Sequence, residues 1–298
     1  MRLIDASYEI IEQEPNILGV YKQIEKAART AYKSEDKITD GSAQRMVDAL
    51  CKSNHGAALE HGTVYLKFPY LTEHCKGTPE FWSRQRLMSE TYYGNPYSRV
   101  SGVQSDGSLY VTTNARVLFE NSVEEDLKYL CEPTEFHEKR ITVKFTTSIG
   151  IVREILRHRH FSFLNESTRY CNYAKGKFNS ELTFIKPDVA NWLSDENYYE
   201  YLAGLQYAEK VYLKAIEHGI KPEIARDILP LSLKSELIVT GFVWDWIHFF
   251  RLRSHIAATG KPHPDIQKLA DPLMQEFIDR GYCTYGQIET TLFKTELL

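Results

Sequence analysis

One stretch of fourteen residues, Arg157–Tyr170, most strongly limits what this chain can fold into. It holds three arginines, two histidines, an asparagine, a glutamate and three hydroxyl-bearing serine or threonine residues. These polar groups are interrupted by aromatic side chains at Phe161, Phe163 and Tyr170, so part of the stretch must be buried while its polar groups converge. Because arginine presents a planar fork of donors that suits phosphate and carboxylate oxygens, the pattern indicates an anionic, ring-bearing small ligand.

Composition narrows the class of protein further. The chain has 298 residues, of which 43% are hydrophobic and 26% charged, as in ordinary globular domains. Its net charge of −4 argues against a protein whose main role is to bind nucleic acid. The basic stretch is therefore interpreted as a local binding site on a mildly acidic protein. We expect no membrane span, because no run of about eighteen apolar residues occurs. The N-terminus lacks the apolar core of a signal peptide.

The number and spacing of the five cysteines predict neither a disulfide framework nor a zinc site. Their number is odd and no two of them have a CxxC spacing. Reduced thiols are typical of cytoplasmic proteins, so we expect this localisation. His158 and His160 could face one side of an extended segment, but the neighbouring arginines would repel a cation, and we expect no metal site.

Hydrophobic periodicity predicts both helices and strands. Apolar residues at helical spacing predict helices over residues 17–32, 42–51, 198–218, 243–253 and 264–280. Alternation predicts strands near residues 2–10, 63–68, 141–147 and 231–241, and a hairpin with strands over 97–103 and 108–117. Ser148 is suited to cap a helix that delivers Arg157, after which we expect extended chain. Residues His55–His61 allow two interpretations, a polar helix start or a loop that contributes to a ligand site.

Familiar catalytic and nucleotide-binding loops are missing. The sequence has no GxSxG elbow for a serine nucleophile, so Ser167 is better interpreted as a hydrogen-bonding residue. It also has neither GxxxxGK[ST] nor GxGxxG, so a nucleotide would have to be held by side chains. The arginines available near aromatic segments are Arg153, Arg157, Arg159, Arg169, Arg226 and Arg253.

The spacing of these residues resembles the flavin-dependent thymidylate synthase family. Arg157-His158-Arg159 followed after seven residues by Ser167 matches the family signature RHR-x7-S. Five further elements are similar to family motifs and occur in the family's order between residues 27 and 270: Ala27-Ala28-Arg29 with Tyr32, His55 to His61, Ala225-Arg226 with Leu229-Pro230, His248 to Arg253, and Pro262 to Ile266.

This resemblance implies a fold and an activity. The fold would be α+β: a single catalytic domain over residues 1–298, with a mixed or antiparallel sheet, packed helices and an insertion at about 70–140. The protein would be an FAD-dependent methyltransferase that converts dUMP to dTMP with methylenetetrahydrofolate and NADPH as co-substrates. It would form a homotetramer with shared active sites, and would need no nucleic acid or membrane partner. Chemistry carried by a flavin accounts for the missing triad and metal.

The resemblance also implies roles for individual residues. Arg253 would be catalytic, because it resembles the residue that favours ionised uracil N3. The positions that resemble dUMP-binding residues are Glu154, Arg157, Asn165, Glu166, Ser167, Thr168, Arg169 and Arg226. The positions that resemble FAD-binding residues are Arg157, His158, Arg159, Asn165 and His248.

Several positions depart from the family pattern. Glu154 stands where the family usually has glutamine, and Leu164-Asn165 stands where it usually has Asn-Glu. Ala57 replaces the usual hydroxyl residue, and Phe242 and Trp244 replace the usual asparagine and arginine. Two alternatives therefore stay open: a related flavoenzyme acting on another pyrimidine nucleotide, and a non-catalytic nucleotide- or RNA-binding protein.

Overall fold

A four-stranded antiparallel sheet forms the centre of the computed structural model, which describes residues 1–69, 88–174, 176–178, 180–188, 194–257 and 260–289. Its strands follow the order β2-β6-β9-β7, and their bounds are Ser7–Ile11 (β2), Arg140–Ser148 (β6), Lys234–Phe242 (β9) and Ser162–Asn165 (β7). The long pair β6 and β9 runs from Arg140 opposite Phe242 to Ser148 opposite Lys234. β7 is one of the two edge strands, and Ser162 lies opposite Thr240.

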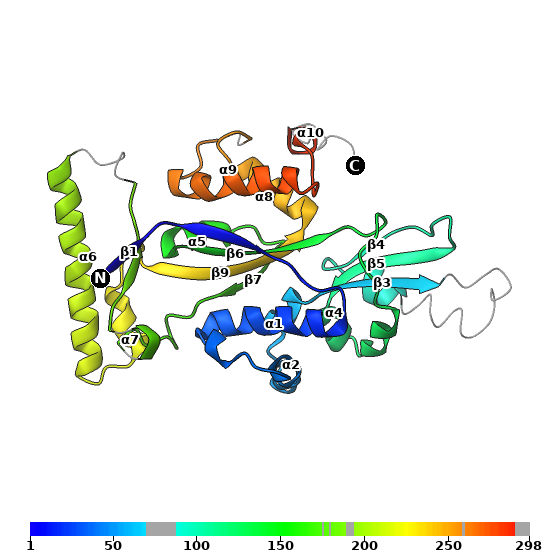
Figure 1. Cartoon of the computed structure of the whole chain (residues 1–298), viewed down its shortest axis with the longest axis horizontal. Coiled ribbons are helices and arrows are strands. Elements are labelled where there is room, and N and C mark those ends of the chain that lie inside the picture. The colour runs from blue at the N-terminus through cyan, green and yellow to red at the C-terminus, as the bar shows by residue number, and fades with distance from the viewer. Residues whose placement is uncertain (70–87, 175, 179, 189–193, 258–259, 290–298) are drawn as a thin grey trace.

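Helices cover both faces of this sheet (Figure 1). One face carries α5 (Ile149–Ile155), α8 (Val243–Arg253) and α9 (Pro264–Asp279), followed by α10 (Tyr285–Glu289). The apolar stripe of α8 packs here: Trp246, Phe249 and Phe250 are fully buried against strand residues such as Phe145 and against α9. The other face carries α1 (Ile17–Tyr32), which packs against α2 (Ser42–Lys52).

The region expected as an insertion contributes to a second sheet. Its strands follow the order β3-β5-β4, and their bounds are Thr63–Pro69 (β3), Ser108–Asn114 (β5) and Arg99–Val100 (β4). The expected hairpin is confirmed, because β4 pairs antiparallel with β5 through a turn in which Gly107 adopts a φ of 73°, but its first strand covers only Arg99–Val100 of the expected 97–103. The second strand ends earlier than expected, because the Asn114 side chain accepts a hydrogen bond from the Val117 amide and begins α4 (Ala115–Glu120).

The opposite end of the molecule is built by α6 (Asp195–Glu217) and α7 (Pro222–Ala225), beside a two-stranded parallel pair of β1 (Arg2–Ile4) and β8 (Thr183–Ile185). Figure 1 shows α6 standing across the end of the central sheet, with α7 at its foot. The observed architecture is therefore α+β, as expected. No helix in the described part of the chain is both long and apolar enough to cross a membrane.

Candidate active site

The signature residues lie in the turn between α5 and β7. Ser148 caps α5, because its hydroxyl accepts a hydrogen bond from the Ile151 amide, as predicted. The expected extended chain begins later than predicted: residues 156–161 turn back over the sheet, and the strand starts at Ser162. Phe161 anchors this turn, because its ring packs 4.5 Å from that of Trp246 and also lies against Gly241 of β9.

Arg253, at the end of α8, meets this turn. Its Nη1 donates to a carboxylate oxygen of Glu154 at 2.9 Å, and its Nη2 donates to the Glu154 backbone carbonyl at 3.1 Å. Its Nε donates to His158 Nε2 at 3.1 Å. Three residues that sequence patterns singled out separately are thus brought together. We call Glu154, His158 and Arg253 the Arg253 group.

His158 is held in its neutral form. Burial, and then the positive charge of Arg253, lower the pKa of its imidazole to about 3. Its Nε2 accepts from Arg253, so the ring proton of the neutral form lies on Nδ1. The ring packs edge-on against Phe249 at 5.1 Å and against His248 at 6.0 Å. His158 therefore serves as an acceptor that orients Arg253.

Arg157 and Arg159 flank His158 and are exposed. Among the described residues, neither guanidinium has a hydrogen-bond or ion-pair partner that would satisfy its charge. Two such cations on one short turn suit a phosphate or pyrophosphate ligand.

A second group of predicted residues lies after β7, near α7. Arg226 Nη1 donates to Thr168 Oγ1 at 3.1 Å, and Arg169 Nε donates to Glu223 of α7 at 3.2 Å. The Ser167 amide donates to the Ala31 carbonyl at 2.9 Å, which fixes this segment to the end of α1. We call Ser167, Thr168, Arg169 and Arg226 the Arg226 group. Among the described residues, no hydrogen bond or ion pair joins the Arg226 group to the Arg253 group.

Asn165 and Glu166 are more enclosed than their predicted binding roles suggest. The Ser235 hydroxyl donates to Asn165 Oδ1 at 2.9 Å. The Glu166 side chain has no exposed surface, and it accepts from Lys234 Nζ at 2.7 Å and from the Tyr173 hydroxyl at 3.1 Å. Its carboxylate is thus occupied inside the protein, and sequence reasoning did not identify Lys234 or Tyr173 as its partners.

Lys234 connects Glu166 to a larger cluster of charges that sequence reasoning also missed. Glu236 pairs with Lys33, Lys144 and Lys234 at 2.9, 2.6 and 3.0 Å. Burial by itself raises the pKa of Glu236, but the positive charges of these lysines lower it to about 2. The alternation Lys234-Ser235-Glu236 on one strand could have indicated charges on a shared face, but only strand pairing brings Lys144 beside them.

Residues His55–His61 contribute a short 3₁₀ helix, Gly56–His61, against β3. Glu60 pairs with Arg116 of the insertion at 2.6 Å. His61 is fully buried with Nδ1 2.8 Å from Thr240 Oγ1, and burial lowers the pKa of its imidazole to about 3. A short helix is observed, as in the first interpretation, but its polar residues are not all at the surface, because His61 is fully buried.

The region expected as an insertion covers Phe242, one of the two positions where the usual asparagine and arginine are replaced. The Arg99 guanidinium lies 4.5 Å from the centre of the Phe242 ring and pairs with Glu138 at 3.3 Å. Trp244 stays about half exposed, with Arg251 lying 5.6 Å from its ring centre. The region expected as an insertion thus places the cation of Arg99 beside Phe242.

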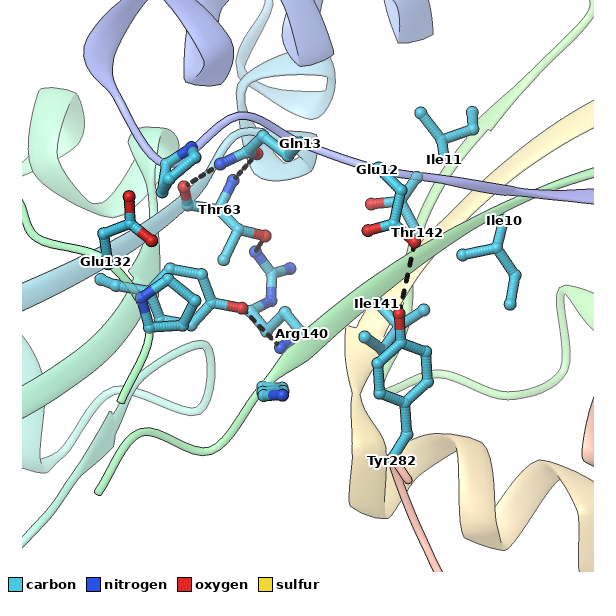
Figure 2. Close-up of a pocket in the computed structure, with 14 residues that line it drawn as sticks. Ile10, Ile11, Glu12, Gln13, Thr63, Glu132, Arg140, Ile141, Thr142 and Tyr282 are labelled. Atoms are coloured by element: carbon cyan, nitrogen blue, oxygen red, sulfur yellow. Dashed lines mark hydrogen bonds between the residues drawn. The ribbon is translucent and has the colours of Figure 1, made fainter. Parts of the chain in front are cut away.

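A separate cavity of about 270 Å³ opens between β2, β3 and β6 (Figure 2). Arg140 lies on its wall and is only 6% exposed; its Nη1 donates to the Glu60 carbonyl at 3.0 Å and its Nη2 to Ser162 Oγ at 3.3 Å. Figure 2 shows Arg140 and Thr63 on one side of the view, and Glu12 and Tyr282 on the other. None of the predicted site residues lines this cavity. Arg140 instead ties the 3₁₀ helix to the start of β7.

Comparisons with known proteins agree with the sequence motifs. The model of a family described as thymidylate synthase complementing protein matches residues 120–280, more than half of the chain. A probable flavin-dependent thymidylate synthase of Paramecium bursaria Chlorella virus 1 is 33% identical over 144 residues, which cover 44% of this chain and 64% of that protein. A flavin-dependent thymidylate synthase of Synechocystis sp. is 34% identical over 138 residues, which cover 42% and 61%. The chain therefore spans less than two thirds of the length of these relatives.

Solved structures include a more distant similarity. A UMP/dUMP methylase from Streptomyces cacaoi, crystallised with 5-Br dUMP, is 20% identical with a TM-score of 0.44, and the match covers 94% of this chain and 93% of that one.

Proposed function

The chain belongs to the thymidylate synthase complementing protein family, and from that premise we propose that it is a flavin-dependent thymidylate synthase. It would transfer a methylene carbon from methylenetetrahydrofolate to C5 of dUMP and reduce it to the methyl group of dTMP. The relatives that it matches carry the name of this activity. Residues 1–298 would form a single catalytic domain that includes the insertion.

One observation supports this proposal more than any other. Glu154 and His158 hold the Arg253 guanidinium in place, and two of its N–H donors remain available to a ligand. Arg253 is the residue assigned to the uracil ring. A fixed, positively charged donor beside the ring stabilises the negative charge that develops when C5 attacks the methylene carbon. Because Glu154 and His158 fix the orientation of Arg253, little reorganisation is needed during the reaction.

The donor set also fits FAD. The exposed cations of Arg157 and Arg159 suit its pyrophosphate, and His248 lies at the edge of the same turn. When bound, the flavin would supply the redox chemistry, with NADPH as the source of hydride. The chain's own residues would bind the nucleotide, orient it and favour the ionised ring. Ser167, Thr168, Arg169 and Arg226 would bind dUMP, with Asn165 and Glu166 positioned behind them.

We further propose that the protein is a homotetramer whose active sites are shared between subunits. The Arg253 group and the Arg226 group share no hydrogen bond or ion pair in the described part of one chain, which supports this arrangement. A partner subunit would bring its own copy of one group to the other, as closed symmetric oligomers permit.

An absorbance spectrum and one isotope assay test the proposed activity. We expect purified protein to show flavin absorbance, and to release tritium from [5-³H]dUMP when NADPH and methylenetetrahydrofolate are present. A protein that neither retains nor accepts FAD would rule the proposal out.

Two controls separate the alternatives. Turnover of dCMP in preference to dUMP would indicate a related flavoenzyme for another pyrimidine nucleotide. RNA affinity that falls steeply with salt, without bound flavin, would indicate a binding protein instead.

A further inference from the structure

Arg253 uses three of its five N–H donors within the protein. A guanidinium carries one N–H on Nε and two on each Nη. His158 accepts from Nε, the Glu154 carboxylate accepts from Nη1, and the Glu154 carbonyl accepts from Nη2. One donor on each Nη is left over. These two remaining donors are available to acceptors on a planar ligand.

Glu154 contributes to this arrangement twice, through its side chain and through its backbone. The pair is well enclosed, since the side chains of Arg253 and Glu154 are 15% and 29% exposed. The other charged or titratable groups that act on the pair are Arg157, from the same turn, and His158, which is neutral. Glu154 is therefore the carboxylate that offsets the charge of Arg253, where the family usually has a neutral glutamine.

We propose that Glu154 is a positioning residue that fixes Arg253 as a two-donor fork for the pyrimidine ring, and that its negative charge sets the pH at which ring N3 of the bound nucleotide ionises. The proposal rests on the proposed function. Uracil that has lost its N3 proton offers two adjacent acceptors, O2 and N3, which match the fork. Neutral uracil offers O2 but turns an N3–H donor toward the second guanidinium donor.

The two parts of this role can be separated by two variants. Glu154→Gln keeps a side-chain oxygen that accepts from Nη1, but removes the negative charge. Glu154→Ala removes both the charge and the side-chain acceptor. With its charge no longer offset, Arg253 in Glu154→Gln favours the anionic ring more strongly, so N3 ionises at lower pH.

The probe is 5-fluoro-dUMP, because its fluorine lowers the pKa of N3 into a range of pH that the experiment can reach. Its ionisation can be followed by ¹⁹F NMR and by ultraviolet absorbance in the complex with the FAD-loaded, full-length protein. Without NADPH and methylenetetrahydrofolate no turnover occurs, so the readout is independent of catalysis. Glu276→Gln is the matched control, because Glu276 is 31% exposed and pairs with Arg280 on α9, away from the predicted site.

We expect the pKa of N3 in the bound probe to fall by roughly half a unit to one unit in Glu154→Gln. In Glu154→Ala we expect its dissociation constant to rise about tenfold, because the fork is no longer fixed from both sides. Glu276→Gln should change neither value. Bound FAD and the unfolding temperature establish that each variant is folded.

The outcomes distinguish this inference from the proposed function. With a wild-type protein that binds the probe, N3 could ionise at the wild-type pH in Glu154→Gln, or Glu154→Ala could keep wild-type affinity for the probe. Either result would contradict the role of Glu154 and leave the proposed function standing. If the wild-type protein does not bind 5-fluoro-dUMP, both are overturned.

Discussion

Three carboxylates close to the candidate site have different surroundings, and these decide what each can do. Glu154 is partly exposed and pairs with one arginine. Glu166 is fully buried between Lys234 and Tyr173, and its charge holds the end of β7 against β9. Glu236 stands among three lysines, and its carboxylate is the centre of that cluster.

The Glu236 cluster predicts a pH-dependent contribution to stability. The pKa of Glu236 is about 2 in the folded protein, below its ordinary value of 4.5. Its contribution is therefore present above pH 4.5 and is lost as the pH falls toward 2. We expect Glu236→Gln to lower the free energy of unfolding by on the order of 2 kcal/mol at pH 7, and by roughly half of that at pH 3. Urea unfolding at the two pH values measures the difference.

Glu120→Gln provides the control for this experiment. Glu120 is largely exposed and pairs with Arg116 on the same helix. Exposed pairs of this kind contribute between about 0 and 1 kcal/mol. An equal loss in Glu236→Gln at both pH values would contradict the electrostatic explanation and indicate a packing effect instead.

At the scale of elements, the turn between α5 and β7 depends on a close contact with β9. A Cβ atom at Gly241 would lie 2.2 Å from Phe161 Cδ1, far closer than van der Waals contact. Glycine at this position therefore lets the Phe161 ring rest on the strand. Since Phe161 follows Arg157–His160 directly, the same contact positions the exposed arginines of the turn.

We predict that Gly241→Ala displaces this turn. Overpacking of this kind costs about 1–3 kcal/mol of folding stability, and we expect FAD retention to fall together with it because Arg157 and Arg159 move. Thermal unfolding and the flavin absorbance of the purified variant measure the two effects.

Gly204→Ala is the matched control, since Gly204 lies in α6 with no heavy atom near its missing Cβ. Helix propensity predicts a gain of roughly 0.5–1 kcal/mol there. If Gly241→Ala keeps wild-type flavin content and stability, the proposed dependence of the turn on Phe161 is wrong.

For the whole assembly, the proposed sharing of active sites between subunits predicts complementation between inactive subunits. Arg226→Ala and Arg253→Ala should each abolish most turnover alone. If a site combines Arg226 of one subunit with Arg253 of another, random co-assembly leaves about a quarter of the sites intact. We therefore expect co-expressed variants to recover about a quarter of wild-type activity in the tritium-release assay.

Separately purified variants that are mixed without subunit exchange provide the control, and they should stay inactive. Co-assembled variants with no recovered activity would contradict sites shared in this way, and a monomeric mass in light scattering would contradict the tetramer.

The sequence by itself determined the main helices and the family, whereas the one strand expected near residues 2–10 is two strands that belong to different sheets. Helices α1, α6, α8 and α9 lie close to their expected bounds, because an apolar stripe at helical spacing is a local property of the chain. The cap at Ser148 and the hairpin before β5 were predictable for the same reason. The motifs could also be recognised, since their spacing is written in the chain.

Only the tertiary structure decided which charges meet. Glu154 and Arg253 are 99 residues apart, and their contact depends on α5 and α8 packing on the same face of the sheet. The burial of Glu166 depends on the register of β7 against β9, and the contact of Arg99 with Phe242 depends on where the insertion folds back. Such contacts are set by packing between distant segments, which residue spacing along a chain does not encode.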